Sequence, residues 1–151
     1  MIEVGNLAPD FMLKDHNGKE FQLSEIKGKK VLLSFHPLAW TGVCRDQMLS
    51  LENNYDRFSG LNTIPLGISV DSVPSKKAWA VDMDTKNTSL LSDFCPQGAV
   101  AKLFGAFIEE RCIAGRCNII VDENQKVVFA KSYPISELPD IEEIFNFLKS
   151  A

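Results

Sequence analysis

Hydrophobic residues along this chain follow two different patterns, and the two patterns alternate. Short apolar runs bounded by turn-forming residues are typical of buried strands, and they occur at residues 31–35, 64–70, 90–91, 117–121 and 126–130. Apolar residues that recur every three or four positions are typical of amphipathic helices, and such stretches occur at residues 44–60, 74–83, 97–104 and from about 136 onward. The alternation predicts strands and helices that follow one another along the chain.

Turn and cap residues support these boundaries. The dipeptide Asn17-Gly18 tolerates positive φ and joins two apolar segments, which predicts an N-terminal hairpin. Pro74 can open a helix, because its missing N–H costs nothing in the first turn. Ser136 and Glu137 supply capping chemistry, so the last helix is predicted to begin near them.

The resulting order is a hairpin, three strand–helix pairs, a second hairpin and a final helix. Strands that alternate with helices predict an α/β protein with a central mixed β-sheet, helices on both faces and an N-terminal β-hairpin extension. We expect one domain over residues 1–151.

The composition is that of an ordinary globular protein, with 45% hydrophobic and 24% charged residues in a chain of 151. A net charge of -4 argues against a nucleic-acid binder. No apolar run approaches the roughly 20 residues that span a bilayer, and the N-terminus lacks the pattern of a secretory signal. We therefore expect a cytoplasmic protein that binds neither nucleic acid nor membranes.

Cys44 is the residue whose position says most about chemistry. The apolar run 31–35 leads into a loop that contains Pro37 and Gly42, and the predicted helix begins near Cys44. A cysteine at a helix N-terminus faces unpaired N–H groups and the positive end of the helix dipole, and both favour the thiolate. The sequence thus predicts a reactive, nucleophilic cysteine.

The other three cysteines, Cys95, Cys112 and Cys117, carry weaker signals. No two cysteines form a C-x-x-C pair, and a chain of this size without a secretory signal is not a typical disulfide scaffold. The spacing is also unlike that of a zinc site, so we expect no metal and no cofactor. A free cysteine usually behaves as a small hydrophobe, and Cys117, in an apolar run, is expected in or near the core.

The loop around Cys44 resembles the active-site motif of the peroxiredoxins. Pro37, Thr41 and Cys44 match the family pattern P-x-x-x-T-x-x-C, and Thr41 stands where a thioredoxin would carry its first cysteine. Three further segments are similar to family landmarks and come in the family's order: residues 5–11, 90–93 and 116–122. The resemblance implies a thioredoxin-like fold and a thiol-dependent peroxidase that reduces hydroperoxides.

The resemblance also implies a role for each motif residue. Cys44 would be the peroxidatic cysteine, whose thiolate attacks the peroxide and becomes a sulfenic acid. Arg116 would place a permanent cation near the sulfur, and Thr41 would hold a peroxide oxygen through its hydroxyl. The backbone N–H groups of Val43 and Cys44 would stabilise developing negative charge. Pro37 would shape and shield the pocket without offering an N–H.

Several of these residues also have simpler structural explanations. Thr41 could only cap the helix, and Arg116 could be a surface salt-bridge residue, with Arg111 as a nearby competitor. His36 and Trp40 are further candidates for substrate binding. His36 stands before the motif proline, where many relatives carry an aromatic residue, and we expect packing to be its main role. Trp40 could belong to the core, to an interface or to the pocket mouth.

The thiol that reduces the sulfenic acid is a separate question. The chain ends soon after its last predicted helix, so we expect no C-terminal arm with a resolving cysteine, and Leu49 occupies the position where one subgroup carries such a cysteine. These features resemble the one-cysteine AhpE-like branch and its bacterioferritin-comigratory relatives. We expect an external reductant, either a thioredoxin-, glutaredoxin- or mycoredoxin-like protein or a low-molecular-weight thiol, with Cys112 and Cys95 as possible internal resolving cysteines.

Two other functions are compatible with a reactive Cys44. A thiol–disulfide oxidoreductase is disfavoured because no neighbouring thiol is present to release a mixed disulfide. A non-enzymatic peroxide sensor would share the first chemical step with a peroxidase.

We also expect a homodimer, since many relatives dimerise near the active site, and Trp40, Pro74 and Phe107 are candidates for that surface.

Overall fold

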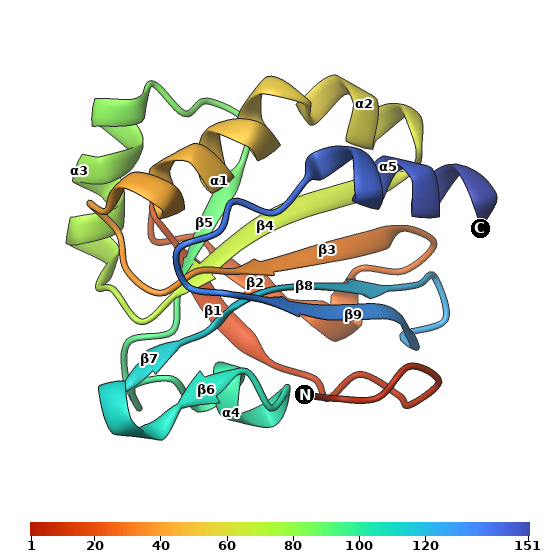
Figure 1. Ribbon diagram of the computed structural model, residues 1–151, viewed down its shortest axis with the longest axis horizontal. Helices are drawn as coiled ribbons and strands as arrows, with labels where there is room; N and C mark the ends of the chain where they lie inside the picture. Colours follow the sequence, from red (N-terminus) through yellow and green to blue (C-terminus); the bar gives the residue numbers. More distant parts are fainter.

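A seven-stranded β-sheet runs through the middle of the protein, described over residues 1–151 by a computed structural model (Figure 1). Its strands are β1 (Met12–Asp15), β2 (Glu20–Gln22), β3 (Lys30–Phe35), β4 (Thr63–Ser69), β5 (Ser89–Ser92), β8 (Arg116–Val121) and β9 (Val127–Tyr133). Their spatial order is β2-β1-β5-β4-β3-β8-β9. The central strands β3, β4 and β5 are parallel, whereas β8 pairs antiparallel with both β3 and β9. The sheet is therefore mixed, as the alternation of elements predicts.

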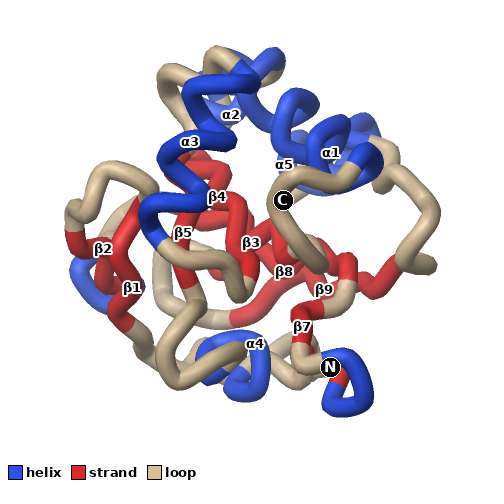
Figure 2. Tube along the Cα trace, turned by 90° about the vertical axis from the view of Figure 1, so that its left-hand side faces the viewer, coloured by secondary structure: helices blue, strands red, loops and turns tan.

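Helices cover both faces of this sheet (Figures 1 and 2). On one face lie α1 (Gly42–Asn53), α2 (Tyr55–Gly60), α3 (Val73–Met83) and α5 (Ile141–Ser150). The other face is covered by α4 (Ala99–Leu103) and by the small two-stranded sheet of β6 (Phe107–Ile108) and β7 (Ile113–Ala114). No helix combines the length and the apolar character that a membrane crossing requires.

The hydrophobic core has two halves, one on each side of the sheet. Leu32 of β3 belongs to the half under α1, while Val31 and Leu33 belong to the half over α4, because successive side chains of a strand point to opposite faces. On the α1 side, the rings of Phe58 and Phe145 lie 4.6 Å apart and join α2 to α5. Burial on both faces explains why β3 is a continuous apolar run.

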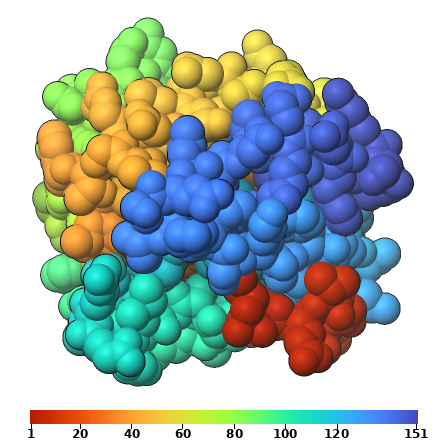
Figure 3. Space-filling model, viewed as in Figure 1, coloured from red at the N-terminus to blue at the C-terminus, as the bar shows by residue number.

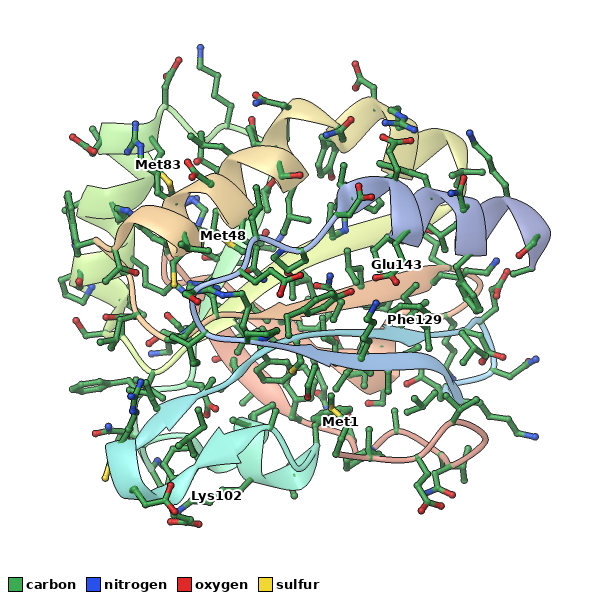
Figure 4. All side chains as sticks on the ribbon, in the orientation of Figure 1. Met1, Met48, Met83, Lys102, Phe129 and Glu143 are labelled. Carbon is green, nitrogen blue, oxygen red and sulfur yellow. The ribbon has the colours of Figure 1, made fainter.

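Close packing against β4 fixes the position of α1. Met48 points from α1 to the sheet (Figure 4), and Gly67 of β4 lies directly beneath it. A Cβ atom on Gly67 would stand only 2.3 Å from the Met48 sulfur, so the absence of a side chain there lets the helix approach. Since Cys44 lies one turn before Met48, this contact also sets the depth of Cys44.

Most predicted elements are confirmed, and the first difference occurs where a side chain competes with the backbone. The predicted helix over 44–60 is divided into α1 and α2 at Asn54, whose φ of -112° and ψ of 15° depart from helical geometry. The Asn54 side chain donates to the Ser50 carbonyl at 2.8 Å, which is the competition with helical hydrogen bonds that asparagine offers.

The start of the last helix was predicted too early. The helix α5 begins at Ile141, and Asp140 caps it by accepting from the Glu142 N–H at 3.0 Å. Ser136 and Glu137 lie in the preceding loop, and Leu138 is 47% exposed. Within α5, Glu143 faces β9 (Figure 4) and accepts from the Tyr133 hydroxyl at 2.6 Å.

Two further features were not predicted. The short strands β6 and β7 lack the length that an apolar pattern needs to be recognised. In α3, Trp79 and Met83 are buried, Ala78 is exposed, and Lys76 in the first turn is fully buried. A buried lysine breaks the rule that charged residues mark the solvent face.

Candidate active site

Cys44 lies where the end of β3 meets the start of α1, and its side chain is only 1% exposed. Thr41 is the N-cap residue, so Val43 and Cys44 belong to the first turn, whose N–H groups have no partner within the helix. The Thr41 hydroxyl makes no capping bond and instead donates to the Leu38 carbonyl at 2.7 Å. The helix N-terminus is thus left without a side-chain cap beside the thiol.

The loop before α1 is held by the neighbouring strand β4. The Ala39 N–H donates to Asp71 Oδ2 at 2.8 Å, and Asp71 lies two residues after the end of β4. Trp40 has a φ of 68°, in the left-handed region that bulky residues rarely adopt. The chain therefore makes a tight, anchored turn immediately before Cys44.

Arg116 brings a guanidinium to the sulfur. It is the first residue of β8, and the antiparallel pairing of Cys117 with Phe35 places it at the same end of the sheet as the Cys44 loop. Its Nη1 lies 3.4 Å from Cys44 Sγ. Two donations to the Ile135 carbonyl, at 2.9 and 2.6 Å, hold the guanidinium in place. Arg116 is 3% exposed and has no carboxylate partner, so it is not a surface salt-bridge residue.

Gln47 completes this arrangement, and it was missed in the sequence. It lies one turn after Cys44 on α1, is 3% exposed, and accepts from Arg116 Nη1 at 2.8 Å through Oε1. Its Nε2 donates to Ser34 Oγ at 2.7 Å, and Ser34 donates in turn to Asn118 Oδ1 at 2.8 Å. The only signal was a polar residue inside an otherwise apolar helical stripe.

These residues surround an open pocket of about 350 Å³. Its walls come from three segments that meet on one face of the molecule, coloured orange, teal and blue in Figure 3. The lining residues are Pro37, Leu38, Thr41, Gly42, Val43, Cys44, Arg111, Ile113, Arg116, Ile135 and Ser136. Five of the residues singled out in the sequence, Pro37, Thr41, Val43, Cys44 and Arg116, are therefore brought together.

His36 and Trp40, the other two candidates for substrate binding, do not line this pocket. His36 is 0% exposed, and its ring packs against that of Trp79 with centroids 5.6 Å apart. Burial, and then the nearby charge of Lys76, lowers the pKa of His36 well below its usual value. Trp40 is 53% exposed, lines a separate hollow together with Arg45, and donates from its indole N–H to Ser75 Oγ at 3.2 Å.

All four cysteines are free thiols in this structure. Burial raises the pKa of Cys117 to about 12, which makes it the inert core cysteine that its strand position predicts. Cys95 and Cys112 are exposed. Cys112 stands between two residues that line the Cys44 pocket, Arg111 and Ile113, whereas Cys95 lines a different one.

The fold and the site together define a class of protein: a thioredoxin-like sheet that presents a single thiol to an arginine at a helix N-terminus. Residues 4–130 match the model of the AhpC/TSA family. The chain is 38% identical over 141 residues to alkyl hydroperoxide reductase E of Mycobacterium tuberculosis. The alignment covers 93% of this chain and 92% of the relative. It is 38% identical over 110 residues to a putative peroxiredoxin, bcp, of Haemophilus influenzae, covering 73% and 69%.

Solved structures agree with this comparison. The reduced 2-Cys peroxiredoxin of Plasmodium vivax superimposes with a TM-score of 0.87 at 26% identity, covering 99% of this chain and 81% of the other. AhpC of Enterococcus faecalis has the same fold, with a TM-score of 0.88 at 24% identity over 99% and 92% of the two chains. The chain belongs to the AhpC/TSA family of peroxiredoxins and is a thiol-dependent peroxidase.

Proposed function

We propose that this peroxidase reduces hydrogen peroxide and organic hydroperoxides with Cys44 as its peroxidatic thiol, and that residues 1–151 act as one catalytic domain. The observation that carries the proposal is the 3.4 Å approach of Arg116 Nη1 to Cys44 Sγ at the floor of an open pocket. A guanidinium keeps its charge throughout the physiological pH range. It therefore places a permanent positive charge beside the sulfur that acts as the nucleophile.

In the proposed reaction the Cys44 thiolate attacks one oxygen of the hydroperoxide. An S–O bond forms, the O–O bond breaks, and the leaving alkoxide or hydroxide takes a proton to become alcohol or water. Cys44 is oxidised to the sulfenic acid and the peroxide is reduced. The negative charge that moves onto oxygen is met by Arg116 and by the first-turn N–H groups of Val43 and Cys44.

Positioning supplies much of the expected rate effect. Arg116 is fixed by Ile135 and Gln47, so its donors do not need to reorganise when charge develops. The Thr41 hydroxyl donates its hydrogen bond to the Leu38 carbonyl. The lone pairs of Thr41 Oγ1 therefore remain free to accept from a peroxide O–H. Pro37 adds an apolar wall without an N–H that would compete for the ligand.

The pocket wall favours a substrate with an alkyl group. Leu38, Ile113 and Ile135 contribute apolar surface around the thiol, and such surface binds hydrocarbon groups away from water. The mycobacterial relative is named an alkyl hydroperoxide reductase. We therefore expect a larger second-order rate constant with a small organic hydroperoxide than with hydrogen peroxide.

We further propose that an external thiol reduces the sulfenic acid. With Cys44 1% exposed, a reductant can reach the oxidised sulfur only if the first turn of α1 opens locally. The reductant is a thioredoxin-, glutaredoxin- or mycoredoxin-like protein or a low-molecular-weight thiol. Of the two internal candidates, Cys112 is better placed than Cys95, because its neighbours Arg111 and Ile113 line the pocket.

A cytoplasmic homodimer is the form in which we propose that the enzyme works. The apolar side chains of Leu38, which lines the pocket, and Trp40 are both exposed, and we propose that a second copy of the chain covers them. Light scattering coupled to size-exclusion chromatography tests the dimer directly, because Trp40→Glu should yield a monomer.

The decisive experiment compares Cys44→Ser with Cys117→Ser. We expect Cys44→Ser to abolish peroxide consumption in the presence of dithiothreitol, while Cys117→Ser, which alters the buried core thiol, retains most of it. Thiol counting after rapid mixing with one equivalent of peroxide reports which sulfur reacts. Peroxide turnover by Cys44→Ser at the wild-type rate would refute the assignment, and a single stoichiometric burst in the wild type would indicate a sensor instead.

A further inference from the structure

A fully buried lysine lies behind the active-site loop, and nothing in the proposed chemistry uses it. Lys76 of α3 is 0% exposed. Its Nζ donates to Ser69 Oγ at 2.7 Å and to the Leu91 carbonyl at 2.9 Å, and it faces His36 Nε2 at 3.4 Å. Lysine is almost never fully buried without a paired charge, and none of the five ion pairs involves Lys76.

Lys76 and His36 can share their protons in two ways. An ammonium has three donors, so His36 Nε2 accepts the third bond and the histidine proton sits on Nδ1. A neutral amine instead accepts from His36 Nε2–H with its lone pair. In both arrangements His36 Nδ1 stays buried without a partner, as an orphan donor in the first and an orphan acceptor in the second. Neither arrangement of the protons satisfies every nitrogen of the pair.

Hydrogen bonds connect this pair to the loop that presents Cys44. Ser69 accepts from Lys76 and donates to Asp71 Oδ2 at 2.6 Å. The same carboxylate oxygen accepts from the Ala39 N–H at 2.8 Å. A continuous chain of three hydrogen bonds thus runs from the Lys76 amine to the backbone of the loop between Pro37 and Thr41.

The charged and titratable groups around the pair come from every neighbouring element. The charges of Asp71 after β4, Cys44 on α1 and Asp93 after β5 act on Lys76. The charge of Arg116 on β8 acts on His36, and the charge of Lys76 acts on His16 in the β1–β2 turn. Among these groups, Cys44 is the one whose charge changes in the proposed reaction, from thiolate to neutral sulfenic acid.

We propose that Lys76 is a positioning residue of this peroxidase: its ammonium form favours the Cys44 thiolate and, through Ser69 and Asp71, holds the 37–41 loop in the reactive conformation. The inference rests on the proposed role of Cys44. Coupling between two charges is reciprocal, so loss of the thiolate must weaken the hold of Lys76 on its proton by the same factor.

The direction of the pH effect follows from the surroundings of Lys76. Burial lowers the pKa of Lys76 to about 7, against the opposing charges of Asp71, Cys44 and Asp93. The ammonium, and with it the support for the thiolate, is complete below this pKa and is lost as the pH rises through it. The benefit from Lys76 is thus greatest on the acidic side of neutrality.

The first test measures Lys76 directly. In protein labelled with ¹⁵N and ¹³C at lysine, the Nζ and Cε resonances of Lys76 are followed against pH by NMR, and Lys76→Met assigns them. We expect a midpoint near neutral pH in the reduced wild type. In Cys44→Ser, where an uncharged hydroxyl replaces the thiolate, the proton affinity of Lys76 should be about threefold to tenfold lower. Equal midpoints in the two proteins would overturn the proposal.

The second test is kinetic and uses Lys77→Met as the matched control, because Lys77 is the adjacent but exposed lysine of α3. Rapid-mixing oxidation by hydrogen peroxide is measured from pH 5.5 to 9. We expect Lys76→Met to be about threefold to tenfold slower than wild type below pH 7, with the ratio shrinking above it, while Lys77→Met follows the wild type. A ratio that stays constant with pH would show that Lys76 is only structural.

The two proposals can fail separately. If Cys44→Ser keeps its peroxidase activity, the assignment of Cys44 is wrong whatever Lys76 does. If Cys44→Ser is inactive but Lys76 titrates identically with and without the thiolate, only the role of Lys76 is refuted. The NMR comparison holds even if Lys76→Met folds less stably than the wild type. In that case the Lys76 signal is assigned by elimination, as the one that belongs to none of the exposed lysines.

Discussion

Gln47 offers the sharpest test of how the site is organised, because it touches Arg116 but lies away from the pocket surface. Its Oε1 accepts from the same Nη1 atom that approaches Cys44 Sγ. Gln47→Leu keeps the volume and removes this acceptor. We expect Arg116 Nη1 to lose its anchor while Nε and Nη2 stay bound to the Ile135 carbonyl, and the second-order rate constant for oxidation of Cys44 to fall.

The expected magnitude follows from the hydrogen bond that is lost. A bond to a charged group contributes about 1.5–3 kcal/mol, and each 1.36 kcal/mol on a barrier is about tenfold in rate. If the loss falls mainly on the transition state, oxidation by hydrogen peroxide slows by between about tenfold and one hundredfold. Stopped-flow tryptophan fluorescence is a suitable assay, because the chain has only two tryptophans and Trp40 adjoins the Cys44 loop.

Asn118→Ala is the matched control. Asn118 is the far end of the same buried network and accepts from Ser34, which Gln47 contacts from the other side. Both variants should lose about 1–2 kcal/mol in the free energy of unfolding, but Asn118→Ala should keep its rate within about threefold of wild type because Arg116 retains its partner.

A double-mutant cycle completes this test. Once Arg116→Met has removed the guanidinium, Gln47→Leu should have little further effect on the rate, since the two residues act as one unit. The proposed role of Gln47 is refuted if Cys44 is oxidised at the wild-type rate in a Gln47→Leu protein whose free energy of unfolding has fallen. It is also refuted if the effects of Gln47→Leu and Arg116→Met on the rate are additive.

Two further predictions concern other parts of the molecule. After one equivalent of peroxide, intact-mass spectrometry should show the gain of one oxygen atom at Cys44 in the wild type, in Cys112→Ser and in Cys95→Ser. A loss of two hydrogens in the wild type that disappears in Cys112→Ser would instead show that an internal cysteine resolves the sulfenic acid. Burial by itself raises the pKa of Glu52. The backbone N–H groups of residues 86–88 donate to its carboxylate, and together these hydrogen bonds outweigh burial, so that the pKa of Glu52 is lower than its usual value. Glu52 therefore stabilises the fold above its unfolded-state pKa, and urea denaturation should find Glu52→Gln less stable than wild type by about 1 kcal/mol at pH 7, with the difference shrinking as the pH falls to 3.

Features that depend on local patterns could be predicted from the sequence. The strand β3 is a continuous apolar run, the loop after it carries the motif, and the helix begins within two residues of Cys44. Arg116 was singled out through the resemblance to the peroxiredoxins, because the apolar run itself begins only at Cys117, and the structure places Arg116 at the start of β8.

Residues that work through contacts across the sheet could not be predicted in this way. Gln47 and Lys76 both interrupt apolar helical stripes, yet a stripe does not reveal which polar groups lie beneath it. Gln47 meets Ser34 of β3 and Arg116 of β8, and Lys76 meets Ser69 of β4 and the carbonyl of Leu91 in β5. Each partner comes from a different strand, so the pairing exists only once the sheet order is known.

The late start of α5 has its physical reason in the active site. A helix that began at Ser136 would draw the carbonyl before it into the first helical turn. In the structure the Ile135 carbonyl instead accepts twice from Arg116, at 2.9 and 2.6 Å. Ile135 and Ser136 instead lie in a turn that forms part of the pocket wall, and Asp140 supplies the cap that Ser136 was expected to give. The same two hydrogen bonds that fix the guanidinium beside Cys44 therefore account for the largest error in the predicted helix boundaries.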